Sequence, residues 1–415
     1  MNCGVYGGQI AKAQCGRKQV PAPARLAKLS AVALLIATSM TGTQAQAADP
    51  EPKVAEIAVK KEAPPAKPTL TVGLGMRTGL ALSFNNPQDK TLISLNDGLV
   101  DQANIRPFMT GQLNPTLGFF GSFELGTAKG LGQFAILDAI MQLKFREEFQ
   151  IWVGQHIGAN DRNNMNGPFF GNGWNFAIGV PSYPFDTGAR DRGFTIWGLI
   201  KGGRLKYHAS MLDLQPGQTL KNARYGGRLV LHLLEPEAFY YNSGTYFGQK
   251  DVLAIGATIN YQKGVETAMP LENDFLGYSF DVFYEKNLGT PGTITLEGGY
   301  WDFSNVDAGY VVNQGTVDQG LGIAGPFPGK SFMASASWLS ANKVGIGQLQ
   351  PNVRYQLGDY DGSTNLHVVD VGLGYIIDGF ADRWYLNYRH RKGGGPMGMS
   401  SPTEDIMQVG FQIMM

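Results

Sequence analysis

Histidine is the residue type in this chain best suited to acid–base or metal chemistry. Its five copies are scattered over the sequence: His156, His208, His232, His367 and His390. The chain contains no His-Glu-x-x-His pair for a zinc site and no Gly-x-Ser-x-Gly elbow for a nucleophile. We therefore predict that the protein is not an enzyme and carries no metal or other cofactor.

The other residues able to do chemistry are charged side chains at alternating positions. Alternate side chains of a β-strand share one face, and this parity assigns ten basic residues to a common face: Arg77, Arg106, Lys144, Lys206, Arg224, Arg228, Arg354, Arg383, Arg389 and Arg391. The acids on that face are fewer: Asp138, Asp281, Glu285, Glu297 and Asp370. If the face lines a water-filled space, this surplus of positive charge favours anions. The alternative is that the arginines pair with the acids and shape the interior.

The element that must position these residues is an amphipathic β-strand. The last ten residues show its pattern, because large apolar side chains occupy every second position: Met407, Val409, Phe411, Ile413 and Met415. Such a strand has one apolar and one wetter face. From residue 69 onward no apolar run reaches 18 residues, which excludes a helical membrane protein. A closed barrel is the other way to span a bilayer.

The alternating pattern recurs along the chain and predicts an all-β, transmembrane antiparallel β-barrel of sixteen strands. The expected strands are 69–79, 104–113, 117–126, 133–144, 149–157, 194–201, 205–214, 223–233, 252–262, 275–286, 293–302, 331–340, 348–357, 366–377, 383–391 and 405–415. Long loops and short turns should alternate between them. The link from Glu235 to Asp251 is long yet falls on the turn side. It is either a folded excursion or a missed hairpin, which would make eighteen strands.

The segment 158–193 is the candidate constriction of the barrel. It follows the fifth expected strand and combines glycines, which allow tight folding, with asparagines and charges. Its charged candidates for lining the pore are Asp161, Arg162, Asp186 and Arg190. From the strands we add eight pore-lining candidates: Arg77, Arg106, Asp138, Lys144, Arg224, Arg228, Arg354 and Arg389.

The N-terminal part indicates export. Residues 1–47 combine a basic stretch, a short apolar run and the small-residue box Ala45-Gln46-Ala47, as in a cleaved signal peptide. Both cysteines, Cys3 and Cys15, lie in this part. Residues 48–68 are rich in proline, alanine and lysine and predict a short periplasmic linker. Residues 69–415 form the predicted barrel domain, located in the outer membrane of a Gram-negative bacterium.

The charge balance argues against a nucleic-acid partner. The whole chain has 34 basic and 34 acidic residues. Loss of the five basic residues of the signal peptide leaves a net charge of −5. A polybasic binder of nucleic acid is therefore not expected.

Three segments resemble the phosphate-selective porin O and P family. They are Asp138–Phe145 followed by Trp152–Gln155, Arg190–Phe194 followed by Gly203–Tyr207 and Met211–Asp213, and Glu235–Asp251 followed by Leu253–Gly256. The resemblance implies a sixteen-stranded, trimeric, passive channel in outer-membrane lipid.

The resulting hypothesis is a porin for passive diffusion of small hydrophilic solutes, with a preference for anions. The alternative is a structural or partner-binding barrel, a sheath or receptor, that does not conduct alone. A sheath is wider and usually longer in chain, so the length of this chain favours the porin.

Overall fold

The computed structural model describes most of the expected barrel domain. The described residues are 67–84, 104–126, 133–178, 190–213, 223–265, 273–304, 317–318, 323–324, 329–360, 365–393 and 403–415. The predicted signal peptide, residues 48–66 of the predicted linker, and Asp186 lie outside these residues. In the described part, no helix is both long and apolar enough to cross a membrane.

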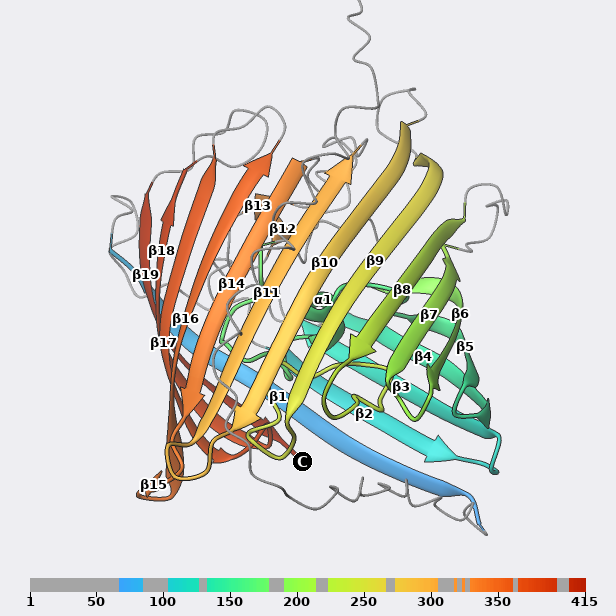
Figure 1. The fold of residues 1–415 in the computed structure, drawn as a ribbon, viewed down its shortest axis with the longest axis horizontal. Helices are drawn as coiled ribbons and strands as arrows, with labels where there is room; N and C mark the ends of the chain where they lie inside the picture. Colours follow the sequence, from blue (N-terminus) through green and yellow to red (C-terminus); the bar gives the residue numbers. More distant parts are fainter. Residues whose placement is uncertain are drawn as a thin grey trace, which may run out of the picture. The chain divides into compact units, whose positions relative to one another are not determined.

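Sixteen antiparallel strands close into one barrel (Figure 1). They are β1 (Thr69–Ser83), β2 (Asn104–Gln112), β3 (Leu117–Gly126), β4 (Gln133–Arg146), β5 (Phe149–His156), β6 (Asp191–Ile200), β7 (Leu205–Leu212), β8 (Arg224–His232), β9 (Val252–Val265), β10 (Asn273–Asn287), β11 (Thr293–Ser304), β14 (Gly329–Leu339), β16 (Gly347–Tyr360), β17 (Leu366–Asp378), β18 (Asp382–Lys392) and β19 (Glu404–Met414). The sixteen-strand prediction is confirmed.

Three further strands have only two residues each and are not counted among the sixteen strands of the barrel wall. β15 (Lys343–Val344) extends the turn before β16, and β12 (Val317–Asp318) pairs with β13 (Ile323–Ala324) in a separate sheet. The link from Glu235 to Asp251 contains no strand. The alternative of a missed hairpin and eighteen strands is therefore wrong.

The barrel closes between its first and last strands. The seam pairs β1 with β19 in a register that runs from Gly75 opposite Met414 to Ser83 opposite Ile406. Past that ladder, the backbone N–H of Leu74 donates to the carbonyl of Met415 at 2.8 Å, and the N–H of Met415 donates back at 3.0 Å. With each strand bonded to two neighbours, the barrel has no free edge, as a lipid-embedded sheet requires.

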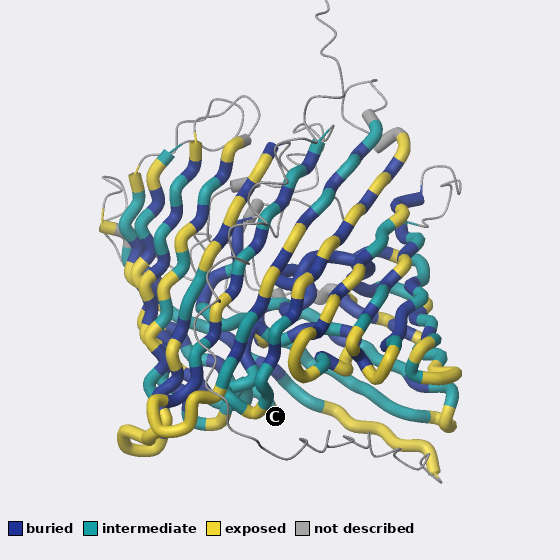
Figure 2. The backbone as a smooth tube through the Cα atoms, in the orientation of Figure 1, coloured by how far each residue is buried: buried dark blue, intermediate teal, exposed yellow. Residues whose placement is uncertain are grey.

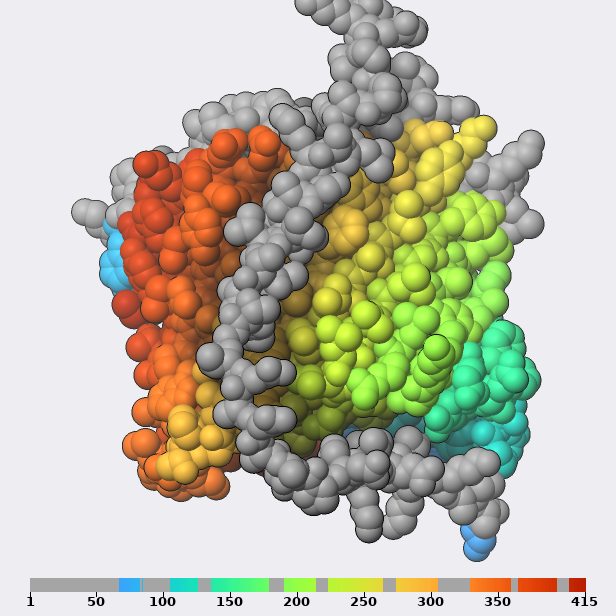
Figure 3. Space-filling model, viewed as in Figure 1, coloured from blue at the N-terminus to red at the C-terminus, as the bar shows by residue number. Residues whose placement is uncertain are grey.

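Burial alternates along most strands and defines two faces (Figure 2). On β1, Val72 is 68% exposed on the outer face, whereas Arg77 is 2% exposed on the inner face. Figure 3 shows green, yellow and orange strands lying side by side on the outside of the barrel. The large exposed side chains of the barrel are mostly leucine, isoleucine, valine and aromatic residues. This is the outer surface of a membrane barrel.

The links between strands divide into a loop end and a turn end, as expected. At the turn end, the Asn114 carboxamide oxygen accepts from the backbone N–H groups of Thr116 and Leu117, both at 2.9 Å, which fixes the β2–β3 turn. Gly289 and Gly292 turn the chain between β10 and β11 with positive φ angles of 75° and 103°. Such local signals make the turns short and set the register of the strands that follow.

The outer face leads to a direct stability prediction at Val371, which is exposed on the outer face of β17. We expect Val371→Arg to destabilise the barrel by about 2–4 kcal/mol if the residue lies at the bilayer midplane, because lipid cannot solvate the charge. Denaturant unfolding in phosphatidylcholine vesicles measures this change. Val371→Leu is the matched control, and equal stabilities of the two variants would contradict the assignment of this face to lipid.

Candidate functional site: the barrel interior

Two segments between strands fold into the barrel. The first is the described part of the predicted constriction, residues 157–178, which follows β5 and which we name the inward loop. It contains the short helix α1 (Arg162–Asn166). The second is residues 235–251, between β8 and β9 at the turn end, which we name the inward turn. Both carry several buried polar side chains. The interior is thus a packed polar assembly rather than an empty cylinder.

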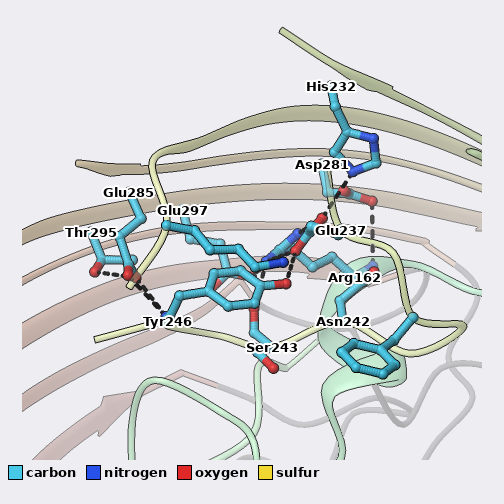
Figure 4. Close-up of polar contacts among 12 residues, drawn as sticks. Arg162, His232, Glu237, Asn242, Ser243, Tyr246, Asp281, Glu285, Thr295 and Glu297 are labelled. Atoms are coloured by element: carbon cyan, nitrogen blue, oxygen red, sulfur yellow. Dashed lines mark hydrogen bonds and ion pairs between the residues drawn. The ribbon is translucent and has the colours of Figure 1, made fainter. Parts of the chain in front are cut away.

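A buried ion pair joins the two segments (Figure 4). The guanidinium of Arg162 on the inward loop donates to both carboxylate oxygens of Glu237 on the inward turn, at 2.8 and 2.7 Å. The two side chains are 0% and 1% exposed. Arg162 also donates to the Ser243 carbonyl and lies 3.6 Å from the ring centre of Phe283 on β10. A two-point contact between a guanidinium and a carboxylate fixes distance and orientation together.

The environment of Glu237 keeps it ionised. Burial by itself raises the pKa of Glu237, but the positive charge of Arg162 and hydrogen bonds from His232 and Arg162 together hold that pKa well below its usual range. The Tyr246 hydroxyl adds a further hydrogen bond to the same carboxylate at 2.5 Å. The ion pair is therefore intact at neutral pH.

The far part of the inward loop is fastened to the opposite wall. The indole of Trp174 lies over Gly410 of β19, where an added Cβ would come within 2.2 Å of the ring. Arg77 of β1 donates to the Trp174 carbonyl at 2.6 Å and lies 4.3 Å from the centre of the indole. Arg383 of β18 donates to the carbonyl oxygens of Phe169 and Gly171. The inward loop therefore crosses the interior from β7–β11 to β17–β19 and β1.

The inward turn is held from its own side of the barrel. Glu285 of β10 accepts the backbone N–H groups of Tyr246 and Gly248, each at 2.9 Å. Tyr240 stacks on Trp152 of β5 with ring centres 3.8 Å apart. Lys206 of β7 donates to the Phe239 carbonyl at 2.6 Å. A lysine that parity assigns to the interior face is thus a buried donor to backbone oxygens.

All ten basic residues assigned by parity lie on interior-facing positions of their strands. Six of them form ion pairs: Arg106 with Glu124, Arg224 with Asp191, Arg228 with Asp281, Arg354 and Arg389 with Asp370, and Arg391 with Glu404. Arg77, Lys206 and Arg383 donate to neutral oxygens, while Lys144 is exposed at the turn end. The pairing removes much of the surplus charge that parity alone predicted.

Arg190 and Asp138, both predicted to line the pore, form one further ion pair, with Arg190 Nε 3.2 Å from the carboxylate. Asp161 is buried and caps α1 by accepting from the N–H groups of Asn163 and Asn164. Burial is the main reason that the pKa of Asp161 is raised.

Asp370 is the centre of the most connected charge cluster on the wall. Arg354 and Arg389 flank it, with guanidinium nitrogens at 3.1 and 2.7 Å from its carboxylate. The side chain of Asn175, from the inward loop, donates to it at 3.2 Å. Two arginines share this one acid in the described contacts.

Sequence reasoning missed several residues that shape the interior. Glu237 stands in a link without periodicity, so no pattern could assign it a face. Glu124 was within reach, because it shares the parity of Ser122 on β3 and pairs with Arg106. Asp191 was missed because the charged run Arg190–Arg192 was interpreted as loop, whereas β6 begins at Asp191.

The five histidines lie on five different strands, β5, β7, β8, β17 and β18. His156 contacts the Thr195 hydroxyl at 2.7 Å, and that hydroxyl contacts the Ser210 hydroxyl at 2.9 Å. These contacts form a hydrogen-bonded chain from β5 through β6 to β7. Within the described ranges, no three or more His, Cys, Asp or Glu side chains are grouped so that they could hold a metal ion.

A small polar cavity lies between the inward loop and the wall. Its volume is about 40 Å³, and its lining includes Asn163 of α1, Trp174, Glu297 of β11, and Asn352 and Arg354 of β16. A bound water needs roughly 10–15 Å³ of such space, so about three waters fit. The Arg354 side chain is 12% exposed, which places the cavity beside the solvent-accessible part of the interior.

Comparisons with protein-family models and with curated proteins give no match. The resemblance to phosphate-selective porins therefore stays a prediction.

Solved structures that are similar to this chain in fold include the following three. An OmpF of Salmonella typhi in complex with daunomycin aligns with a TM-score of 0.53 and 12% identity, covering 83% of this chain and 97% of that one. An anion-selective porin from Comamonas acidovorans gives 0.50 and 14%, covering 84% and 100%. OmpT of Vibrio cholerae lacking loop L8 gives 0.50 and 13%, covering 84% and 99%. The chain has the fold of an outer-membrane β-barrel.

Proposed function

We propose that the protein is an outer-membrane porin that lets small hydrophilic solutes diffuse passively, with a weak preference for anions. One observation supports it above the others: a closed sixteen-strand barrel carries an apolar exterior and an interior of charged and amide side chains. Lipid disfavours such an interior unless water reaches it. The similarity in fold to an anion-selective porin agrees with this proposal.

The weak anion preference rests on interior cations for which the described residues show no ion pair with a carboxylate, or only a shared one. Arg383 and Lys206 donate to neutral oxygens, and Asp370 is shared by two arginines. Each ion pair elsewhere on the wall cancels most of its own field at a distance, since opposite charges a few ångströms apart act as a dipole. We therefore expect a modest excess of anion current rather than strict selectivity.

The test is single-channel recording from purified protein in planar bilayers under a salt gradient. We expect discrete current steps and a zero-current potential of the sign given by chloride. Folded protein that never conducts would contradict the porin. It would favour the alternative, a barrel opened by a partner, for which the packing of two segments inside the barrel is the supporting observation.

Asp370 offers a sharper test of the selectivity. We expect Asp370→Asn to raise the permeability of chloride relative to potassium by about two- to fivefold, because one more uncompensated positive charge near the path is worth about 1 kcal/mol in a watery environment. Arg354→Gln should change the ratio in the opposite direction. Asp359→Asn, on the outer face of β16, is the control. A ratio unmoved by Asp370→Asn would place the ion path elsewhere.

We also propose a homotrimer, supported by the uneven height of the barrel wall. β5 and β7 have 8 residues each, whereas β10 has 15. A strand needs roughly 9–11 residues to cross the bilayer when tilted. A wall of short strands is better covered by neighbouring copies than by lipid. Cross-linking and light scattering in detergent measure the number of copies, and a monomer in both would contradict the proposal.

A further inference from the structure

We infer that the cavity beside α1 is a binding subsite for the hydroxyl groups of a neutral polyhydroxyl solute, such as a sugar. This inference rests on the proposed function, since the solute must enter the barrel to reach the cavity. The inference goes beyond the proposed function because it names the class of solute and the protein atoms that bind the solute.

Among the residues that the structure describes, two that line the cavity each have a buried side-chain atom without a hydrogen-bond partner. One is the side-chain amide nitrogen of Asn163, a donor, and the other is Oε1 of Glu297, an acceptor. Both residues are more than nine-tenths buried. Buried polar groups of a folded protein nearly always form hydrogen bonds, so a donor and an acceptor without a hydrogen bond at one cavity indicate a missing partner.

The two atoms together favour a hydroxyl over an anion. A hydroxyl accepts from an N–H group and donates to a carboxylate at the same time. An anion can satisfy the Asn163 amide but is repelled by Glu297. The charged residues of the lining balance, because Arg77 and Arg354 stand against Glu297 and Asp370, so the cavity has no net positive charge to hold an anion. The amides of Asn172 and Asn352 and the indole of Trp174 also border the cavity. Amides and an aromatic ring suit a neutral molecule with hydroxyl groups on an apolar frame.

The volume limits how much of the solute enters. Space for about three waters corresponds to two or three neighbouring hydroxyl groups, not to a whole sugar ring. The cavity therefore holds one edge of the solute while the rest of the solute stays outside the cavity. Such one-sided contact allows binding that is weak and quickly reversed, as a channel requires.

The experiment measures how D-glucose affects the current through single channels of the full-length protein. We expect saturable reduction of the current by glucose, and no saturation with a polyethylene glycol of similar size. Asn163→Ala should weaken the apparent affinity about five- to tenfold, the effect of one lost hydrogen bond. Asn164→Ala removes an equally buried, unpartnered amide that does not border the cavity and should keep the affinity of the unaltered protein.

Several results would overturn the inference. Saturable reduction by inorganic phosphate but not by glucose would assign the cavity to anions. A conducting channel without saturation by glucose would leave the porin standing and refute the subsite. If folded protein does not conduct, the porin fails, and glucose titration of tryptophan fluorescence still decides the subsite. A saturable signal that disappears in Trp174→Phe supports it, and a flat titration refutes it.

Discussion

Replacing Arg162 with methionine is expected to destabilise the protein by about 3–5 kcal/mol. The change leaves Glu237 as a buried charge without its main partner, which is the costly way to disrupt a buried ion pair. The inward loop and the inward turn should then separate, so we also expect larger and noisier current steps. Denaturant unfolding in detergent and single-channel recording measure the two effects on the same preparation.

A double variant is the control for this prediction. Arg162→Met together with Glu237→Leu removes both charges, and replacing a whole buried pair with apolar side chains is often nearly neutral. The double variant should therefore recover most of the lost stability. If it is no more stable than the single variant, packing around Arg162, rather than the charge of Glu237, determines the loss.

The pH dependence separates these two causes further. In the unaltered protein the folded pKa of Glu237 lies well below its usual range. Its contribution is therefore present above the unfolded pKa, about 4.3, and is lost only as the pH falls through the folded value. Stability should not change between pH 8 and 5 on its account. In Arg162→Met, burial dominates and raises the pKa, so stability should increase as the pH is lowered.

Replacing Trp174 with alanine is expected to have an effect of similar size. The indole is buried, contacts Arg77 and lies over Gly410. Removing a buried aromatic side chain costs about 3–5 kcal/mol, because the cavity that it leaves fills only in part. The far part of the inward loop loses its anchor, so the conductance should rise as the bore widens.

The outer face supplies a matched control for Trp174. Trp384→Ala removes the same side chain from a site that is 48% exposed on the exterior of β18. Its loss should leave the single-channel conductance unchanged. Equal conductance of Trp174→Ala and the unaltered protein would show that the inward loop does not set the width of the path.

Most of the barrel was predictable because the alternation of side chains along each strand is visible in a short stretch of sequence. In a strand between lipid and a polar interior, apolar and polar side chains must alternate. The sequence alone therefore assigns residues such as Arg77 and Val72 to opposite faces. The ends of strands were less certain. β1 continues to Ser83, beyond the expected end at residue 79, because β19 offers it backbone partners as far as Ile406. Pairing between distant strands is not visible in the sequence of either one.

The interior was less predictable for a related reason. Irregular segments have no period, and their position depends on partners far along the chain. Arg162 contacts Glu237 across 75 positions and Asp281 across 119. The sequence indicated that the segment 158–193 enters the barrel, through glycines and polar residues. It could not indicate that the inward turn enters from the other end and meets the inward loop, and it left open whether the wall arginines pair with acids.

The seam between β1 and β19 sets the order of events when this protein is made. The two strands are separated by nearly the whole barrel sequence, so the contact that completes the wall is the last one that synthesis makes available. Until then both edges expose unpaired backbone groups, which readily join those of another chain. We therefore expect assembly to be slow and prone to aggregation. Proteins that cover the open edges of the sheet should make it more efficient.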